Sequence, residues 1–321
     1  MLLGTKIIKN SKINIKFAAE ILKKNNVIGI PTETVYGLGG RADKDEVVKK
    51  IFKIKNRPLL NPLILHYKNS SCALNDIFID ERAEELSKNF WPGPLTIVSR
   101  IKSKSISNLV TANLNTLAVR VPGNKTIRDL LQFLEFPIAA PSANRFGKIS
   151  PTSAKDVLEE LKNKIPFILD GGQSYLGIES TIIDLSTKKT SILRHGYITS
   201  NAIEKVLNLR LHASSGGKII KAPGQNINHY QPDLPVRINA RSKRKNEAWL
   251  AFGEIQKKSK EPILSLSKKK CLIEASQNLY KMLRKLNKKK VTGIAVQKIP
   301  NIGLGIAIND RLLKASKKKK I

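Results

Sequence analysis

The segment Pro31-Thr32-Glu33-Thr34-Val35-Tyr36-Gly37-Leu38-Gly39 follows a short apolar run, Val27-Ile28-Gly29-Ile30, which has the length and composition of a buried strand. Two hydroxyls and a carboxylate therefore come directly after a strand, and the glycines allow the backbone to approach a ligand closely. Three cations follow about one helix later, at Lys53, Lys55 and Arg57. Hydroxyls at a strand end beside clustered cations suit a small polar substrate held next to phosphates.

Residues 1–208 alternate apolar strands with amphipathic helices and contain no internal repeat. The pattern predicts helices over residues 14–24, 43–54, 80–90, 125–134, 152–162 and 199–207. It predicts strands over residues 27–30, 62–66, 95–100, 117–121, 137–140, 167–169, 181–185 and 191–194. Asp43 and Glu46 match a capping box at the start of the second helix. This alternation is typical of an α/β domain with a twisted, mixed sheet, whose strand-end loops are the natural place for a site.

The rest of the chain has a different pattern. Residues 209–235 are rich in Gly, Ser, Pro and polar residues and are interpreted as a linker. Residues 236–321 are interpreted as a second, small α/β domain. Its expected strands are 249–253 and 291–296, and its expected helices are 275–286 and 304–315.

Composition limits the classes of protein to consider. Cys72 and Cys271 form no CxxC pair and the four histidines lack metal-ligand spacing, so neither a disulfide nor a protein-bound metal is expected. The N-terminus has no signal-peptide pattern and no apolar run long enough to span a bilayer, which predicts a cytoplasmic protein without membrane contact.

The formal net charge of +33 favours a polyanionic partner. From Arg210 onward the chain has 27 basic and 6 acidic residues. Nucleic-acid-binding surfaces usually mix arginines and aromatic residues among the lysines. The blocks Lys268-Lys269-Lys270 and Lys288-Lys289-Lys290 do not, so compositional drift toward AT-rich codons and a true binding surface are both open interpretations.

The segment after the second helix is expected to hold phosphates. Pro58 disfavours a helical conformation at Arg57, so this segment is predicted to be extended. Residues two apart in an extended chain share a face, which would point Lys53, Lys55 and Arg57 the same way. The alternative is a solvated basic surface, which explains Lys53 better than the other two.

Two arginines lie in predicted strands. Arg120 occurs in the otherwise apolar run 117–121, where a buried guanidinium needs a partner. Either a structural salt bridge or a ligand carboxylate held by two hydrogen bonds would satisfy it. Arg194 raises the same question at the end of strand 191–194.

Polar side chains also follow the strand 137–140. Ser150 and Thr152 are alternatives for the N-cap of the next helix, whereas Ser142 and Asn144 cap nothing and are better ligand candidates.

Eight motifs of the first domain, in this order, resemble the threonylcarbamoyl-AMP synthases, a family built on the YrdC domain. They are Pro31-Thr32-Glu33-Thr34-Val35-Tyr36-Gly37-Leu38, Lys55-Asn56-Arg57, Asn61-Pro62-Leu63, Trp91-Pro92-Gly93-Pro94-Leu95-Thr96, Ala118-Val119-Arg120-Val121-Pro122, Pro141-Ser142-Ala143-Asn144, Ser180-Thr181-Ile182-Ile183-Asp184 and Arg194-His195-Gly196. The segments 222–224 and 229–232 are similar to the linker of the long, two-domain form. Compared with the second domain of that long form, the second domain of this chain is short near residues 240–262, which predicts that a strand–helix unit is missing.

The resemblance implies a YrdC-like domain with an open cleft and a small Rossmann-like domain. It implies a nucleotidyltransferase that forms L-threonylcarbamoyl-AMP and pyrophosphate from L-threonine, bicarbonate or CO2, and ATP. Other proteins would then transfer the threonylcarbamoyl group to an adenosine beside the anticodon of certain tRNAs. Mg2+ is expected to arrive with ATP, held mostly by phosphate oxygens and water. The basic surface is a candidate for tRNA contact.

The resemblance also implies roles for individual residues. The threonine-binding residues would be Thr34, His66, Arg120, Ala140 and Ser180. The ATP-binding residues would be Arg57, Asn61, Thr116, Ser142, Ser150, Arg194 and Tyr230. Lys55 and Arg57 are the expected catalytic residues, because they would stabilise the phosphates, and no general base stands out. Tyr230, in the linker, is expected to close over ATP and exclude water from a reactive mixed anhydride.

Two alternatives explain less of the sequence. A non-catalytic RNA-binding or ribosome-maturation factor fits the charge but leaves the hydroxyl-rich strand ends and the strand arginines unexplained. A carbamoyl-transfer maturation enzyme would share the YrdC segment but would carry zinc-finger and acylphosphatase parts, for which this sequence has no pattern.

Overall fold

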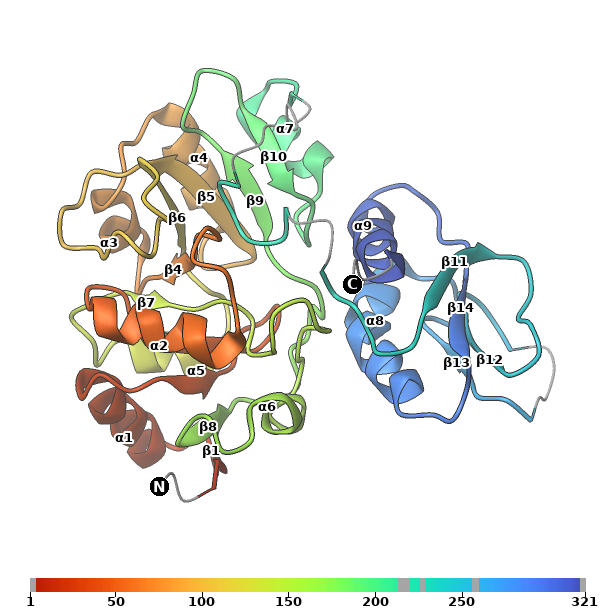
Figure 1. Ribbon diagram of the computed structural model, residues 1–321. Helices are drawn as coiled ribbons and strands as arrows, with labels where there is room; N and C mark the ends of the chain where they lie inside the picture. The colour runs from red at the N-terminus through yellow and green to blue at the C-terminus, as the bar shows by residue number, and fades with distance from the viewer. Residues whose placement is uncertain (1–3, 213–219, 226–228, 256–259, 318–321) are drawn as a thin grey trace.

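The computed structural model describes residues 4–212, 220–225, 229–255 and 260–317 and contains two sheets (Figure 1). The helices that accompany the first sheet are α1 (Lys12–Lys23), α2 (Asp45–Lys55), α3 (Ser70–Asn75), α4 (Glu81–Phe90), α5 (Lys125–Leu131), α6 (Ala154–Leu161) and α7 (Ser200–Leu207). Its strands are β1 (Lys6–Lys9), β2 (Ile28–Ile30), β3 (Gly37–Arg41), β4 (Ile64–His66), β5 (Leu95–Arg100), β6 (Thr116–Arg120), β7 (Ile138–Ala139), β8 (Phe167–Asp170), β9 (Thr181–Asp184) and β10 (Ser191–Arg194).

The first sheet has the order β1-β8-β2-β3-β7-β4-β6-β5-β9-β10. It is mixed: β4 pairs with β6 and β5 with β9 in parallel, whereas β3 pairs with β7 and β5 with β6 in antiparallel. The predicted α/β class with a mixed sheet is therefore confirmed.

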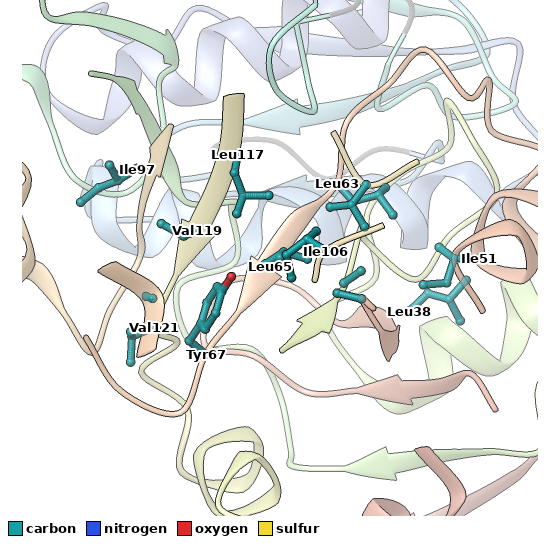
Figure 2. Packing of buried hydrophobic residues seen from close by; sticks show 14 of the residues in the cluster. Leu38, Ile51, Leu63, Leu65, Tyr67, Ile97, Ile106, Leu117, Val119 and Val121 are labelled. Atoms are coloured by element: carbon teal, nitrogen blue, oxygen red, sulfur yellow. The ribbon is translucent and has the colours of Figure 1, made fainter. Parts of the chain in front are cut away.

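The two faces of this sheet are covered differently. Leu65, Leu117 and Val119 point into the main hydrophobic cluster, which also contains buried residues of α2, α4 and α6 (Figure 2). Their neighbours Ile64 and Ala118 point to the opposite face, as strand alternation requires, and pack with Ala222 of the linker. This second face carries the candidate site described below.

The second sheet is parallel throughout, with the order β11-β14-β12-β13. Its elements are β11 (Val236–Ala240), β12 (Glu247–Ala251), β13 (Ile263–Ser265), α8 (Leu272–Asn287), β14 (Gly293–Gln297) and α9 (Leu304–Ser316). Figure 1 shows α8 and α9 between this sheet and the rest of the molecule. Between the end of β11 at Ala240 and the start of β13 at Ile263, the described residues form one strand, β12, and no helix.

Three local predictions were wrong. The helix α2 begins after Lys44, and Asp43 forms no cap because its carboxylate binds Arg41 at 2.6 Å. The helix α6 is capped by Ser153, in a capping box with Asp156, and not by either predicted residue.

The third error concerns the segment that was expected to be extended. Lys55 is the last residue of α2, and Asn56 follows in a left-handed conformation with φ 51° and ψ 46°. Lys53 is therefore exposed while Lys55 and Arg57 are buried, so the three cations do not share one extended face.

Candidate active site

A small cavity lies on the face of the first sheet opposite the main hydrophobic cluster. It is lined by the loop after β2, by β4 and β6, by the loop after β7, by Arg194 at the end of β10 and by the linker. Its free volume is about 40 Å3, well below the ~300 Å3 or more of most ligand pockets. The linker thus closes the cleft, which was expected to be open.

One side of the cavity is built around Arg120. His66 and Arg120 are register partners on β4 and β6, so both side chains project from the same face. The guanidinium donates to Thr34 Oγ1 at 3.1 Å and to Glu33 Oε1 at 2.5 Å. Burial would raise the pKa of Glu33, but the positive charge of Arg120 lowers it below its ordinary value. Arg120 is thus already paired with Glu33, and the hydroxyl of Thr34 lies beside its guanidinium.

His66 is neutral at physiological pH. Burial, followed by the charge of Arg120, lowers its pKa from 6.5 to about 3. Its Nδ1 atom is buried without a hydrogen-bond partner among the described residues. A neutral imidazole with an unused nitrogen can donate or accept one hydrogen bond, so it suits a polar ligand group beside Arg120.

The other side of the cavity contains two further arginines. Arg57 donates to the carbonyl oxygens of Asn61 and Pro62, at 3.3 and 3.0 Å. Arg194 donates to the carbonyl oxygens of Ser180 and Pro223, at 2.9 and 3.3 Å.

Within the described part of the chain neither Arg57 nor Arg194 forms an ion pair. Burial, followed by the charge of Arg194, lowers the pKa of Arg57 to about 9. Both guanidiniums are buried and are held by neutral oxygen atoms, namely these carbonyl oxygens and the hydroxyl of Ser180, so they create a positive potential that favours a phosphate group.

Lys55 occupies a different position from the one expected for a phosphate ligand. Its ammonium is buried and donates to the carbonyl oxygens of Ser142 and Asn144, the latter at 2.5 Å. Burial, followed by the charge of Arg57, lowers its pKa well below the ordinary value. In this arrangement Lys55 holds the loop after β7, whose Ser142 lines the cavity.

The linker supplies the outer wall. Tyr230 is fully buried, its ring centroid lies 4.0 Å from that of His229, and its hydroxyl has no hydrogen-bond partner among the described residues. The Nδ1 atom of His229 is also buried and unpartnered there. Buried polar atoms are normally paired, so these atoms and His66 Nδ1 indicate where a polar ligand would be bound.

Sequence reasoning missed a buried carboxylate, Glu179, that lines the same cavity. Glu179 accepts hydrogen bonds from Ser150 Oγ at 2.7 Å, from Tyr280 at 2.9 Å and from Arg311 at 3.0 Å. Burial alone would raise its pKa, but Arg311 and Arg194 lower it to about 2. Glu179 directly precedes the motif that begins at Ser180, yet its partners are 101 and 132 residues away along the chain and give no local signal.

The structure brings most of the predicted site residues together. The predicted residues that line the cavity are Thr34, Arg57, His66, Arg120, Ala140, Ser142, Arg194 and Tyr230. Lys55, Asn61, Thr116, Ser150 and Ser180 are buried but are not part of the lining. Two of these hydroxyls already have partners, since Ser150 binds Glu179 and Ser180 receives a hydrogen bond from Arg194. The individual roles of all these residues stay predictions.

Comparisons with known proteins identify the family of the chain. Residues 20–196 match the Sua5–YciO–YrdC family model, described as telomere recombination, and residues 198–317 match the C-terminal domain of threonylcarbamoyl-AMP synthase. The threonylcarbamoyl-AMP synthase of Pyrococcus abyssi is 39% identical, over 94% of both chains. That of Bacillus subtilis is 36% identical, over 93% of this chain and 92% of that protein.

Solved structures of related proteins also resemble this chain. The crystal structure of P. abyssi Sua5 complexed with L-threonine superposes with a TM-score of 0.88 and 35% identity, over 97% of each chain. The shorter E. coli YciO, at 24% identity and a TM-score of 0.54, covers 60% of this chain and shows the fold of the first sheet alone. Fold and site together define a YrdC-like protein with an added C-terminal α/β part. The chain belongs to the threonylcarbamoyl-AMP synthase family.

Proposed function

We propose that the chain forms L-threonylcarbamoyl-AMP and pyrophosphate from L-threonine, bicarbonate or CO2, and ATP, as a nucleotidyltransferase. The observation that carries the proposal is the division of one cavity into two sides. Arg120, Thr34 and His66 form one side, and the unpaired Arg57 and Arg194 form the other. The first side suits an amino acid and the second suits a triphosphate.

The chemistry requires positioning and charge neutralisation. The amine of threonine adds to the carbon of CO2 and loses a proton, which gives a carbamate. A carbamate oxygen then attacks the α-phosphorus of ATP, and the bond to the leaving pyrophosphate breaks. Two buried guanidiniums facing the triphosphate would stabilise the charge that develops on the phosphate oxygens, and the fixed Arg120 would hold the threonine carboxylate.

Magnesium fits this site as a companion of ATP. Among the described residues, no group of three His, Cys, Asp or Glu side chains could hold a metal ion. The carboxylates of Glu33 and Glu179 are already engaged by arginines. The ion would therefore be held by phosphate oxygens and water, where it would neutralise triphosphate charge.

The product implies further partners. A mixed anhydride of this kind needs a protein that transfers the threonylcarbamoyl group to tRNA, and the synthase would work in the cytoplasm, where tRNA and ATP are present. In the part of the chain that the structure describes, no helix has the length and apolarity needed to cross a membrane.

An omission assay tests the proposal. Pyrophosphate release is followed with ATP, bicarbonate and threonine together and then with each omitted in turn, while the adenylate product is identified by mass. Release should require all three substrates. Equal release without threonine would contradict the proposal, because it would indicate another amino substrate or simple ATP hydrolysis.

A further inference from the structure

The C-terminal part contains a second cavity, lined by none of the residues of the catalytic cavity. Its free volume is about 630 Å3, and it lies at the carboxyl ends of β11, β12 and β14 in the small sheet. Its lining includes Arg241, Lys243, Trp249 and the block 268–270. In open parallel sheets, ligands bind in the crevice outside the carboxyl ends of the strands.

The fold assembles a combination of residues that the linear sequence does not show. Lysines 268–270 precede α8, Arg241 follows β11 directly, and Trp249 comes from the middle of β12. As a run in the chain, the lysine block has no arginine or aromatic residue beside it. In the structure it shares one cavity with both, which is the composition expected of a nucleic-acid-binding surface.

The cavity has a marked excess of positive charge. Five cationic side chains line it against one carboxylate, Glu254. Lys243 is partly neutralised by Glu261, at 2.5 Å, whereas Arg241 and Lys268 to Lys270 are exposed.

The aromatic side chain is also placed to contact a ligand. Leu250 and Val296 point toward α8 and α9 in the second hydrophobic cluster, so Trp249 points to the opposite face of the sheet. It is half-buried beside its register partner Ile263, which also lines the cavity. A half-buried indole that lines a cavity next to cations can stack on a nucleobase while the cations bind the flanking phosphates.

We propose that this cavity binds single-stranded RNA, with a base stacked on Trp249 and phosphates bound by Arg241 and the lysines 268–270. Stacking needs an unpaired base, so a loop of a tRNA is a suitable segment. The site is separate from the catalytic cavity, since none of its lining residues belongs to the first sheet or to the linker.

Binding of a labelled tRNA transcript, measured by fluorescence anisotropy at several salt concentrations, tests the proposal. The double variant Lys268→Ser/Lys269→Ser should bind about tenfold more weakly, with a salt slope smaller by about 1 to 2. Trp249→Ala should bind roughly 5- to 150-fold more weakly with an unchanged slope, and Trp249→Phe should recover most of that loss.

The chain offers a matched control for charge. Lys289 and Lys290 are exposed lysines in the same part of the molecule, outside the cavity, so Lys289→Ser/Lys290→Ser makes the same change in net charge. Its affinity for the transcript should stay within about twofold of the parent. Equal losses in the two lysine pairs would overturn the proposal and indicate general charge attraction.

Tryptophan fluorescence distinguishes RNA from a small anion. The only other tryptophan, Trp91, is buried and donates to Leu95 O at 2.7 Å, so quenching on addition of a decauridylate should report Trp249 and should be lost in Trp249→Phe. Quenching by inorganic phosphate or ATP that RNA does not compete away would contradict the proposal. Pyrophosphate release without RNA should be unchanged in all these variants, so failure of RNA binding and failure of the proposed catalysis are separable.

Discussion

The arginines of the catalytic cavity differ in what holds them. Arg120 is held by a carboxylate, whereas Arg57 and Arg194 are held by neutral oxygen atoms and form no ion pair among the described residues. A buried cation without a counter-ion is costly, and a bound anion removes that cost. A bound triphosphate would therefore stabilise Arg57 and Arg194 more than it would stabilise Arg120.

This difference predicts separate effects on the two substrates. Arg57→Met should raise the KM for ATP about 30-fold or more and leave the KM for threonine within about threefold. The double variant Glu33→Gln/Arg120→Met leaves no unpaired charge in the interior. It should raise the KM for threonine about 30-fold or more and leave the KM for ATP within about threefold. Steady-state kinetics with one substrate varied at a time provides the measurement, and equal changes in both KM values for both variants would refute the assignment.

For individual residues, the sequence predicted which side chains belong to the site better than it predicted what those side chains contact. Strand position identified Arg120 and Arg194, because a guanidinium in an apolar strand needs a partner. The burial of Lys55 could not be predicted, because it depends on the left-handed residue after α2 and on carbonyl oxygens almost 90 residues away.

At the scale of elements, the end of α2 sets the direction of Arg57. Asn56 ends the helix in the left-handed region, which Asn and Gly adopt more readily than other residues. Its side chain is exposed, so its contribution is conformational. The helix α7 ends in the same way at Asn208, with φ 48° and ψ 41°, far along the chain from Arg57.

These two helix ends give a matched pair of variants. Asn56→Val and Asn208→Val should each lower the free energy of unfolding by about 1–2 kcal/mol, as measured by urea titration. Only Asn56→Val should also lower kcat/KM for ATP, by more than about fivefold, and Asn56→Gly should restore both properties. An equal loss of activity in the two valine variants would show that α2 has no special role in positioning Arg57.

The linker is the second element with a consequence for activity. Tyr230 fills the outer wall of a cavity that is too small for a nucleotide in this conformation, so ATP entry requires the wall to move. Tyr230→Ala should weaken ATP binding and lower turnover, each about tenfold, because water is no longer excluded from the product. Tyr230→Phe, which removes only the unpartnered hydroxyl, should change them less. Unchanged ATP affinity and turnover in Tyr230→Ala would reject the closing role.

Sequence patterns missed several strands and one helix, and these omissions have physical reasons. The strand β3 is Gly37-Leu38-Gly39-Gly40-Arg41, which lacks the alternating apolar residues of an ordinary strand. A side chain at position 40 would lie 2.6 Å from Val47, so the glycine permits α2 to pack on the strand. The strands β1, β11 and β13 and the helix α3 were also missed. Both β1 and β13 lack a fully buried residue, and β11 has only its two end residues buried, so none of these strands shows a continuous apolar run.

At the scale of the whole molecule, Glu179 joins the two halves of the chain. Tyr280 and Arg311 belong to α8 and α9, whereas Ser150 and Glu179 belong to the loops of the first sheet. Arg284 of α8 adds a salt bridge to Glu160, at 3.2 Å. Sequence patterns predicted two units but no contact between them, because periodicity carries only local information.

This junction predicts a pH dependence of stability. The pKa of Glu179 is about 2 when folded against an ordinary 4.5, so the folded state binds fewer protons and its stability is lost as pH falls. Between pH 7 and pH 3 this carboxyl should account for a loss of about 2 kcal/mol in the free energy of unfolding. Urea titrations at several pH values should show that loss in the parent and not in Glu179→Gln.

An ion pair at the surface, whose side chains are 18% and 23% exposed, supplies the control. Asp43→Asn removes the partner of Arg41, where solvent screens the interaction, and should alter the pH dependence much less. If Glu179→Gln loses as much stability on acidification as the parent does, other carboxyls determine the acid response.

The same junction restricts how this protein can be recombined. A chimera that takes its C-terminal part from a relative would bury Glu179 against whatever that relative carries at positions 280 and 311. Unless the donor supplies a hydroxyl and a guanidinium there, the carboxylate of Glu179 would lose these partners inside the catalytic cavity, so the two halves are constrained to change together.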